Sequence, residues 1–190
     1  DVVYAAFDNH KRGDFKPYLL KSADRGKTWV SVAGDLPSRG TVYTVAEDPG
    51  RPGLLFCGTE SGLFFSHEGG KRWLQLKGGM PTINVRDLAF QERERSLVVA
   101  TFGRGFRVLD DLTPLRLATP ETVAKEAVLF PVRDAWAYVP RVPLGLKGKA
   151  FLGESLYTAE NPPFGAVFTT YLKEELKGRK KARQDAEKEK

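Results

Sequence analysis

The sequence predicts an all-β fold: a partial β-propeller of about three four-stranded blades, followed by a connector, a strand and a charged C-terminal helix. The first observation is an internal repeat, because the segments that begin at Ser22 and Ser66 match at Ser, acid, Gly, Lys and Trp with an offset of 44 residues. A fixed period of this size indicates stacked supersecondary units. The second observation is that one period holds four short apolar runs separated by Gly, Pro and Asp, which is the strand content of a propeller blade.

The middle unit is the most clearly bounded, with strands expected at residues 41–46, 54–58, 63–65 and 73–76. These runs are rich in β-branched and aromatic residues and alternate little, which favours sheets that are buried on both faces. The first unit begins with the apolar run at residues 2–7. A third unit is expected at residues 85–90, 96–101 and 106–109, and it lacks the Ser-Asp-Gly-Trp turn.

The repeated octapeptide predicts a hairpin turn that bonds to itself. Ser22 and Asp24 can accept hydrogen bonds from turn amides, and Gly26 can take a positive φ. The tryptophan that ends each copy, Trp29 or Trp73, is expected to pack between adjacent sheets. In the second copy Glu and Arg replace Asp and Thr, which should loosen the turn. The residues to which we assign this structural role are Ser22, Asp24, Gly26, Thr28, Trp29, Ser66, Glu68, Gly70 and Trp73.

The first copy, Ser-x-Asp-x-Gly-x-Thr-Trp, resembles the Asp-box of the BNR-repeat propellers, a group that includes sialidases, xyloglucan-cleaving hydrolases and sortilin-type sorting receptors. Residues 48–49, 54–62 and 100–115 resemble the C-terminal blades of large bacterial propeller proteins described as sortilin-like or as glycosyl hydrolases. Those relatives usually carry His where this chain has Phe102. Residues 161–172 are similar to the opening of the β-sandwich that follows such propellers. The resemblance implies an exported parent protein, extracellular or periplasmic.

Three segments are expected along the chain. Residues 1–131 are the C-terminal blades of the propeller, residues 132–160 are a connector rich in Pro and Gly, and residues 161–190 begin a following β-rich domain with a charged helical tail. Three blades fall short of a closed ring. The chain begins with Asp1, and an apolar run follows at once. We therefore expect a fragment whose partners include the remaining blades of its parent.

Composition argues against several classes of function. The net charge is +6, but residues 173–190 alone hold eight basic and five acidic side chains in a mixed pattern, which is typical of a solvated helix rather than of a nucleic-acid site. Cys57 is the single cysteine and is expected to be a small buried hydrophobe, and His10 and His67 are the only histidines. No metal or other cofactor is expected. No apolar run reaches the length of a membrane span.

The resemblance also implies where a ligand would bind, because in Asp-box propellers the turn lies on the face away from the binding cleft. The opposite rim would hold the loops at residues 8–16, 34–40, 59–62, 78–84 and 101–105. Their polar side chains suit a carbohydrate, peptide or protein ligand. Arg104 is the strongest candidate, because its flanking glycines permit a sharp bend, and its alternative role is an ion pair between blades. The rim candidates are His10, Arg12, Arg39, Asn84 and Arg104.

Glycoside hydrolysis requires two carboxylates about 5 to 10 Å apart. Asp110 and Asp111 are adjacent on a strand and point to opposite sides, so Asp14 and Glu60 are the only plausible acid pair. We therefore predict a noncatalytic structural or ligand-binding segment of a sortilin-like BNR-repeat propeller. The alternative is part of a carbohydrate-active glycoside hydrolase, either sialidase-like or xyloglucanase-like.

Overall fold

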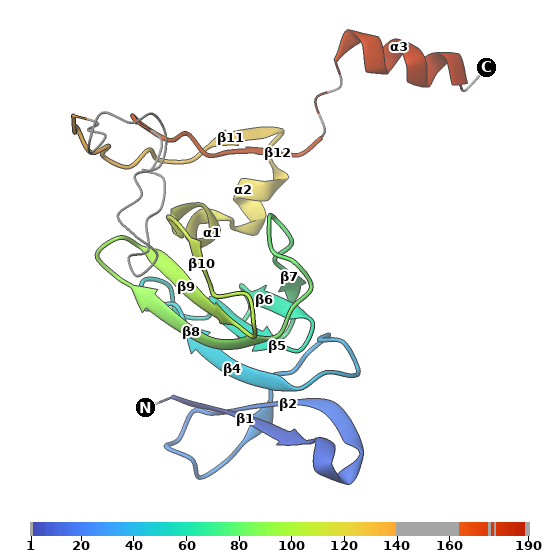
Figure 1. The fold of residues 1–190 in the computed structure, drawn as a ribbon, viewed down its shortest axis with the longest axis vertical. Helices are drawn as coiled ribbons and strands as arrows, with labels where there is room; N and C mark the ends of the chain where they lie inside the picture. The colour runs from blue at the N-terminus through green and yellow to red at the C-terminus, as the bar shows by residue number, and fades with distance from the viewer. Residues whose placement is uncertain (1, 140–163, 175, 177, 189–190) are drawn as a thin grey trace, which may run out of the picture. The chain divides into compact units, whose positions relative to one another are not determined.

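A computed structural model describes residues 2–139, 164–174, 176 and 178–188 of the chain (Figure 1). The chain divides into two compact units, residues 1–116 and residues 117–190. The sequence places the end of the blades near residue 131, whereas the unit that holds the three sheets ends at residue 116. Most of the expected connector, and residues 161–163 after it, lie outside the described residues.

The first unit consists of three antiparallel sheets in chain order, which confirms the all-β partial propeller. The first sheet contains β1 (Val3–Asn9), β2 (Asp14–Ser22) and β3 (Val30–Ser31), with the short 3-10 helix η1 (His10–Arg12) between its first two strands. The middle sheet contains β4 (Val42–Glu47), β5 (Leu55–Thr59), β6 (Gly62–Ser66) and β7 (Leu74–Gln75). The third sheet contains β8 (Val85–Gln91), β9 (Ser96–Thr101) and β10 (Phe106–Leu109).

Only the middle sheet has the four strands that the repeat predicts, and each neighbouring sheet has three. In the middle sheet the turn motif joins the third strand to the fourth, whereas in the first sheet it joins the second to the third. The first sheet therefore lacks a counterpart of β4. The third sheet lacks a counterpart of β7, because the chain enters helix α1 (Thr113–Leu117) soon after β10.

The middle sheet is buried on both faces. Its strand β4 packs beside β1 on one side and beside β8 on the other. Along β5, Leu55 and Cys57 belong to the core shared with the first sheet, and Phe56 belongs to the core shared with the third. This arrangement explains why β5 is apolar throughout instead of alternating. Burial also raises the pKa of the Cys57 thiol.

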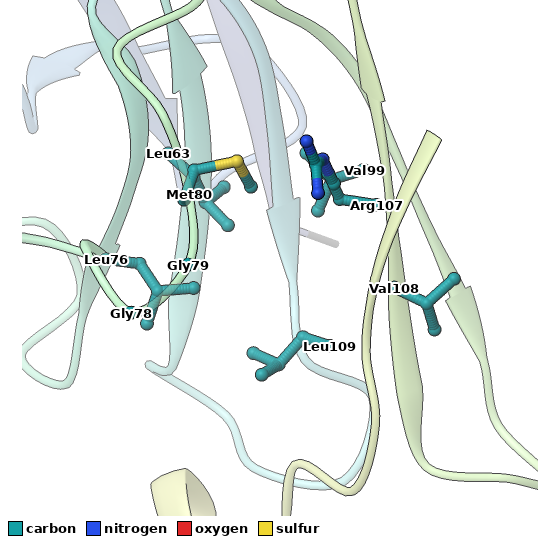
Figure 2. A pocket seen from close by; sticks show the side chains of 9 residues that line it. All are labelled: Leu63, Leu76, Gly78, Gly79, Met80, Val99, Arg107, Val108 and Leu109. Atoms are coloured by element: carbon teal, nitrogen blue, oxygen red, sulfur yellow. The ribbon is translucent and has the colours of Figure 1, made fainter. Parts of the chain in front are cut away.

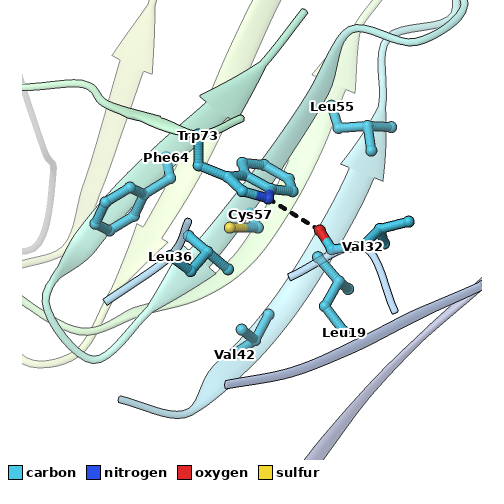
Figure 3. Close-up of a cluster of buried hydrophobic side chains, with 8 residues drawn as sticks. All are labelled: Leu19, Val32, Leu36, Val42, Leu55, Cys57, Phe64 and Trp73. Atoms are coloured by element: carbon cyan, nitrogen blue, oxygen red, sulfur yellow. Dashed lines mark hydrogen bonds between the residues drawn. The ribbon is translucent and has the colours of Figure 1, made fainter. Parts of the chain in front are cut away.

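The second turn motif, residues 66–73, locks the first two sheets together. Trp73 is only 5% exposed, and its indole Nε1 donates to the carbonyl oxygen of Val32 at 3.0 Å (Figure 3). The Trp73 backbone N–H donates to Asp35 Oδ1 at 2.6 Å. Gly70 is required here, because a Cβ atom would lie 2.7 Å from Val32 and its φ is +92°.

Trp29, the same position in the first motif, does not pack between sheets. It is 40% exposed, and its indole nitrogen donates to the carbonyl oxygen of Gly26 in its own turn at 3.0 Å. The expectation that both tryptophans are buried is therefore wrong for Trp29. The physical reason is that no sheet precedes the first one in the described chain, so nothing covers this indole as the first sheet covers Trp73.

A buried ion pair fastens the end of the first unit to its middle sheet. Asp48 is fully buried, and its carboxylate accepts from Arg116 Nε at 2.7 Å and Nη2 at 2.6 Å. Arg51 donates in addition to the carbonyl oxygens of Leu115 and Arg116. The segment that follows β10 is thereby held against the β4–β5 turn by bidentate, charge-assisted bonds.

The second unit contains α2 (Pro120–Ala124), β11 (Ala127–Leu129), β12 (Thr170–Leu172) and α3 (Arg179–Lys188). Strands β11 and β12 pair antiparallel, with Val128 opposite Tyr171. The Tyr171 hydroxyl donates to the Val123 carbonyl oxygen at 3.1 Å. The strand and the charged helix expected after the connector are both present. None of the helices in the described part of the chain is long and apolar enough to cross a bilayer.

Candidate functional site

The antiparallel strand order separates two rims on the first unit. The hairpin loops β1–β2, β5–β6 and β9–β10 lie at one end of their strands, and the turn motifs lie at the other end of β2 and β6. We call residues 8–16, 42–43, 59–62, 85–86 and 101–105 the hairpin rim. Residues 22–29 and 66–73 form the turn rim.

Two matching β-bulges occur where β4 and β8 begin. Val42 pairs with Thr59 and Thr44 with Gly58, so Tyr43 is an extra residue in β4. In the next sheet Val85 pairs with Thr101 and Asp87 with Ala100, so Arg86 is the extra residue in β8. Bulges re-aim a side chain and are frequent beside functional sites. The repeat therefore directs two chemically different side chains, Tyr43 and Arg86, from the same position of consecutive sheets.

The residue beside each bulge is held in the same way in both sheets. The backbone N–H of Glu60 donates to the Thr41 carbonyl oxygen at 3.2 Å, and that of Phe102 donates to the Asn84 carbonyl oxygen at 2.9 Å. Each bond ties a hairpin loop to the residue directly before β4 or β8. Glu60 and Phe102 consequently occupy equivalent positions of the repeat.

These four side chains form a contact cluster that spans two sheets, which we call the platform: Tyr43, Glu60, Arg86 and Phe102. The Arg86 guanidinium carbon lies 4.1 Å from the centroid of the Tyr43 ring and 5.7 Å from that of Phe102, which is cation–π geometry. The Tyr43 hydroxyl donates to Glu60 Oε1 at 3.2 Å. Phe102 is 66% exposed, so its ring offers an apolar surface to solvent.

The Tyr43 hydroxyl is kept protonated. Burial raises its pKa, and the negative charge of Glu60 and the hydrogen bond to it act in the same direction. The charge of Arg86 lowers the pKa of Tyr43, and the charge of Asp8 raises it slightly. Tyr43 is therefore a hydrogen-bond donor to Glu60 at neutral pH, and this bond fixes the ring over which Arg86 lies.

The acids of the rim are already engaged as hydrogen-bond acceptors. Asp8 accepts from the His10 backbone N–H at 2.9 Å and also contacts its Nδ1. Asp14 accepts from the Tyr18 hydroxyl, from the Lys16 backbone N–H at 3.2 Å and from the Asn9 amide at 3.4 Å. The bonds from the Tyr18 hydroxyl and from the Lys16 N–H lower the pKa of Asp14 most.

The two candidate acids, Asp14 and Glu60, have separate hydrogen-bond partners. A general acid needs a raised pKa, whereas that of Asp14 is lowered. Within the described residues, no hydrogen bond or shared partner joins Asp14 to Glu60, since Asp14 bonds inside the first sheet and Glu60 bonds to Tyr43. Glu60 belongs to the platform, and Asp14 serves to hold its own hairpin.

The remaining rim candidates have the following surroundings. His10 and Arg12 are in η1, and the Arg39 guanidinium carbon lies 5.1 Å from the centroid of the Phe15 ring. Asn84 contributes its carbonyl oxygen to the amide of Phe102. Arg104 is exposed at the tip of the β9–β10 loop.

The bend at Arg104 matches the sequence expectation for its flanking glycines. Gly103 and Gly105 take φ values of 77° and 68°, and the Thr101 hydroxyl donates to the Gly105 carbonyl oxygen at 2.7 Å. Among the residues that the structure describes, no ion pair connects Arg104 to another blade. The Arg104 residue is exposed.

The turn motifs form the turn rim, and their polar side chains bond to backbone and side-chain groups of their own turns. Ser22 Oγ accepts from the Gly26 N–H at 2.7 Å, and the Asp24 carboxylate accepts from the Thr28 N–H at 2.9 Å and from its hydroxyl at 2.7 Å. In the second copy Ser66 Oγ accepts from the N–H groups of Glu68 and Gly70 at 3.2 and 3.0 Å. The carboxylate bonds of Asp24 have no equivalent at Glu68 among the described contacts.

An apolar hollow of about 160 Å³ lies between the middle and third sheets (Figure 2). Leu63, Met80 and Leu109 are among the residues that line it, and Arg107 is its one charged side chain. With so few polar groups, it has little means of orienting a polar ligand. In the described part of the chain, no group of three or more His, Cys, Asp or Glu side chains could hold a metal ion.

Sequence reasoning missed Tyr43 and Arg86, which carry the platform. Both lie inside predicted strands. Strict alternation of side chains along a strand assigns each residue to one face and does not reveal a bulge. The available signal is their equal place in the repeat, since each follows a valine that is almost fully buried, Val42 or Val85. A tyrosine at this position in one repeat and an arginine in the next are too different to fill the same place in a core.

The chain matches no protein-family model and no solved structure. It is similar to a probable oligoxyloglucan-reducing end-specific xyloglucanase from Neosartorya fischeri, with 37% identity over 65 residues, or 32% of this chain. The match spans 8% of the length of that fungal protein. A relation to glycoside hydrolases is thus indicated for part of the chain.

Proposed function

We propose that this chain is a noncatalytic, ligand-binding segment of an exported, sortilin-like BNR-repeat propeller, and that its ligand is a carbohydrate. The three consecutive sheets support the propeller assignment, as do the Ser-Asp-Gly-Trp turn at residues 22–29 and its Ser-Glu-Gly-Trp copy at residues 66–73. The partial similarity to a xyloglucanase supports a carbohydrate rather than a peptide.

The platform is the observation that carries this proposal. Sugar rings present an apolar C–H face and a rim of polar groups. The exposed ring of Phe102 can receive the apolar face while Arg86 donates hydrogen bonds to the polar rim. The side chains are pre-positioned, since backbone bonds hold the hairpins and the Tyr43–Glu60 bond holds the ring beneath Arg86. Pre-positioning reduces the entropic cost of binding.

A second candidate is a segment of a glycoside hydrolase, which the xyloglucanase similarity favours. That function needs two carboxylates that flank one bond, one of them with a raised pKa. Asp14 is bonded within its own hairpin and has a lowered pKa. We therefore assign any catalytic pair of the parent to residues outside this chain.

The test uses the 190-residue chain and isothermal titration calorimetry with xyloglucan heptasaccharide, cellohexaose and trigalacturonate. We expect saturable binding of at least one of these sugars, and its loss in Phe102→Ala. Phe164→Ala is a matched control, because Phe164 is 67% exposed but lies in the second unit. Absence of binding to every sugar, or equal binding by Phe102→Ala, would contradict the proposal.

The hydrolase alternative is tested in the same preparation by measuring released reducing ends. We expect none above the background of the buffer. Release that is abolished by both Asp14→Asn and Glu60→Gln would overturn the noncatalytic assignment, since a shared loss is the signature of an acid pair.

A further inference from the structure

On the hairpin rim the carboxylates are engaged in hydrogen bonds, whereas two arginines have no carboxylate partner among the described residues. The rim carries five Lys and Arg side chains against three carboxylates. Those carboxylates, Asp8, Asp14 and Glu60, all accept hydrogen bonds within the chain. Among the described residues, no carboxylate pairs with Arg86 or Arg104.

From this imbalance we propose that the platform binds a sugar that bears a carboxylate, a uronic-acid residue of an oligosaccharide, in preference to a neutral sugar. The carboxylate binds Arg86 and the sugar ring lies against Phe102. This inference rests on the proposed carbohydrate function and specifies the class of sugar.

Arg86 is suited to bind a planar anion. Its guanidinium lies over the Tyr43 ring, which occupies one face and leaves the N–H donors along its edges. Five N–H donors in a rigid fork match the two oxygens of a carboxylate bidentately. Because Arg86 is exposed and meets aromatic rings rather than an acid, this fork is open to a ligand.

Glu60 acts on this fork only through Tyr43. Its carboxylate accepts the Tyr43 hydroxyl at 3.2 Å and thereby sets the ring that supports the guanidinium. Glu60 is therefore a positioning residue. Its negative charge opposes an anionic ligand, whereas Arg86 and Arg104 attract one, and the cationic excess of the rim decides the sign of the local field.

Phe102 favours a charged sugar over a simple anion, because its ring can pack against the sugar ring. Its backbone N–H is fixed by the Asn84 carbonyl oxygen, and its ring faces Arg86 on one side and solvent on the other. A free carboxylate can satisfy Arg86 but leaves this ring uncovered. A uronic-acid ring covers Phe102 while its carboxylate, attached to the same ring, reaches Arg86.

The experiment compares trigalacturonate with its fully methyl-esterified form, in which each carboxylate is a neutral methyl ester, by calorimetry in low salt. We expect the acid to bind about tenfold more tightly or better, the range of a charge-assisted bidentate bond. Arg86→Gln should remove this preference, and Arg86→Lys, which keeps the charge without the fork, should keep only part of it. Arg93→Gln, at an exposed arginine of the β8–β9 loop, is the control and should keep all of it.

Three results would overturn the inference. Equal binding of the acid and its ester refutes the carboxylate preference while leaving the carbohydrate function intact. Failure of every sugar to bind refutes the carbohydrate function itself. Equally tight binding of hexaglutamate refutes the sugar assignment and points to an acidic peptide. Circular dichroism of each variant separates these results from loss of folding.

Discussion

Two tryptophans of one motif differ in their surroundings, and this difference predicts their contributions to stability. Trp73→Ala removes a buried indole and its bond to Val32, and should cost about 3 to 5 kcal/mol. Trp29→Ala removes a half-exposed ring that bonds within its own turn, and should cost much less. Urea unfolding followed by circular dichroism measures both. Equal losses would contradict the assignment of Trp73 alone to the core.

A single carboxylate of the first turn gives a pH dependence with a definite sign. Bonds from Thr28 and Ser22 lower the pKa of Asp24 from 3.8 to about 2. A carboxyl group with a depressed pKa stabilises the fold above its unfolded pKa and loses that effect as pH falls through the folded value. Stability should therefore fall between about pH 4 and pH 2.

The matched variant for this prediction is Asp24→Asn, which should lack this part of the acid dependence. The carboxyl ¹³C resonance of Asp24 should titrate near pH 2 in an NMR pH series, because its acceptor bonds favour the charged form. A midpoint near 4 would contradict the bonded geometry of the turn.

Part of the candidate site was predictable at the level of residues. Loop position was sufficient to place Glu60, Asn84 and Arg104 near the hairpin rim. The bulged residues Tyr43 and Arg86 were not predictable, because a one-residue register shift reverses side-chain direction and leaves no mark on composition.

At the level of elements, the close approach of the middle and third sheets depends on one glycine. A Cβ atom at Gly58 would lie 2.6 Å from Val85 Cγ1 and 2.7 Å from Thr44 Cγ2. Gly58→Ala should therefore destabilise the chain by about 1 to 3 kcal/mol. Gly78→Ala, where a Cβ would meet nothing within 4 Å, is the control and should be neutral or slightly stabilising in thermal unfolding. Equal melting temperatures for the two variants would refute this packing.

The strands were predictable because short apolar runs separated by turn residues are a local signal. The structure of the chain after β10 was not predictable. The sequence indicates a turn before Thr113 and Pro114, and Asp111 does accept the Thr113 N–H at 3.1 Å, but helix α1 follows. Proline fits the first turn of a helix as well as a loop, and the buried Asp48–Arg116 pair that holds this segment joins residues far apart in the sequence.

For the whole molecule, the repeat shows which apolar surface is uncovered. Leu63 and Phe65 of the middle sheet pack in the core shared with the third sheet. Phe106 and Val108 hold the same positions one repeat later and are 74% and 55% exposed. An exposed apolar face of this kind favours dye binding and self-association.

We therefore predict that the chain binds anilinonaphthalene sulfonate and elutes partly as oligomers in size-exclusion chromatography with light scattering. Phe106→Ser combined with Val108→Ser should reduce both signals. Val132→Ser, in the second unit, should leave them unchanged. A monodisperse monomer without dye binding would contradict the uncovered face.

We expect the ligand to bind the hairpin rim and not the turn rim. An NMR titration of the ¹⁵N-labelled chain with trigalacturonate tests it most directly, because it reports every amide at once. Chemical-shift changes should be concentrated at Tyr43, Glu60, Arg86 and Phe102, and residues 22–29 and 66–73 should be unaffected. Changes centred on the turn motifs, or no changes at saturating sugar, would contradict it.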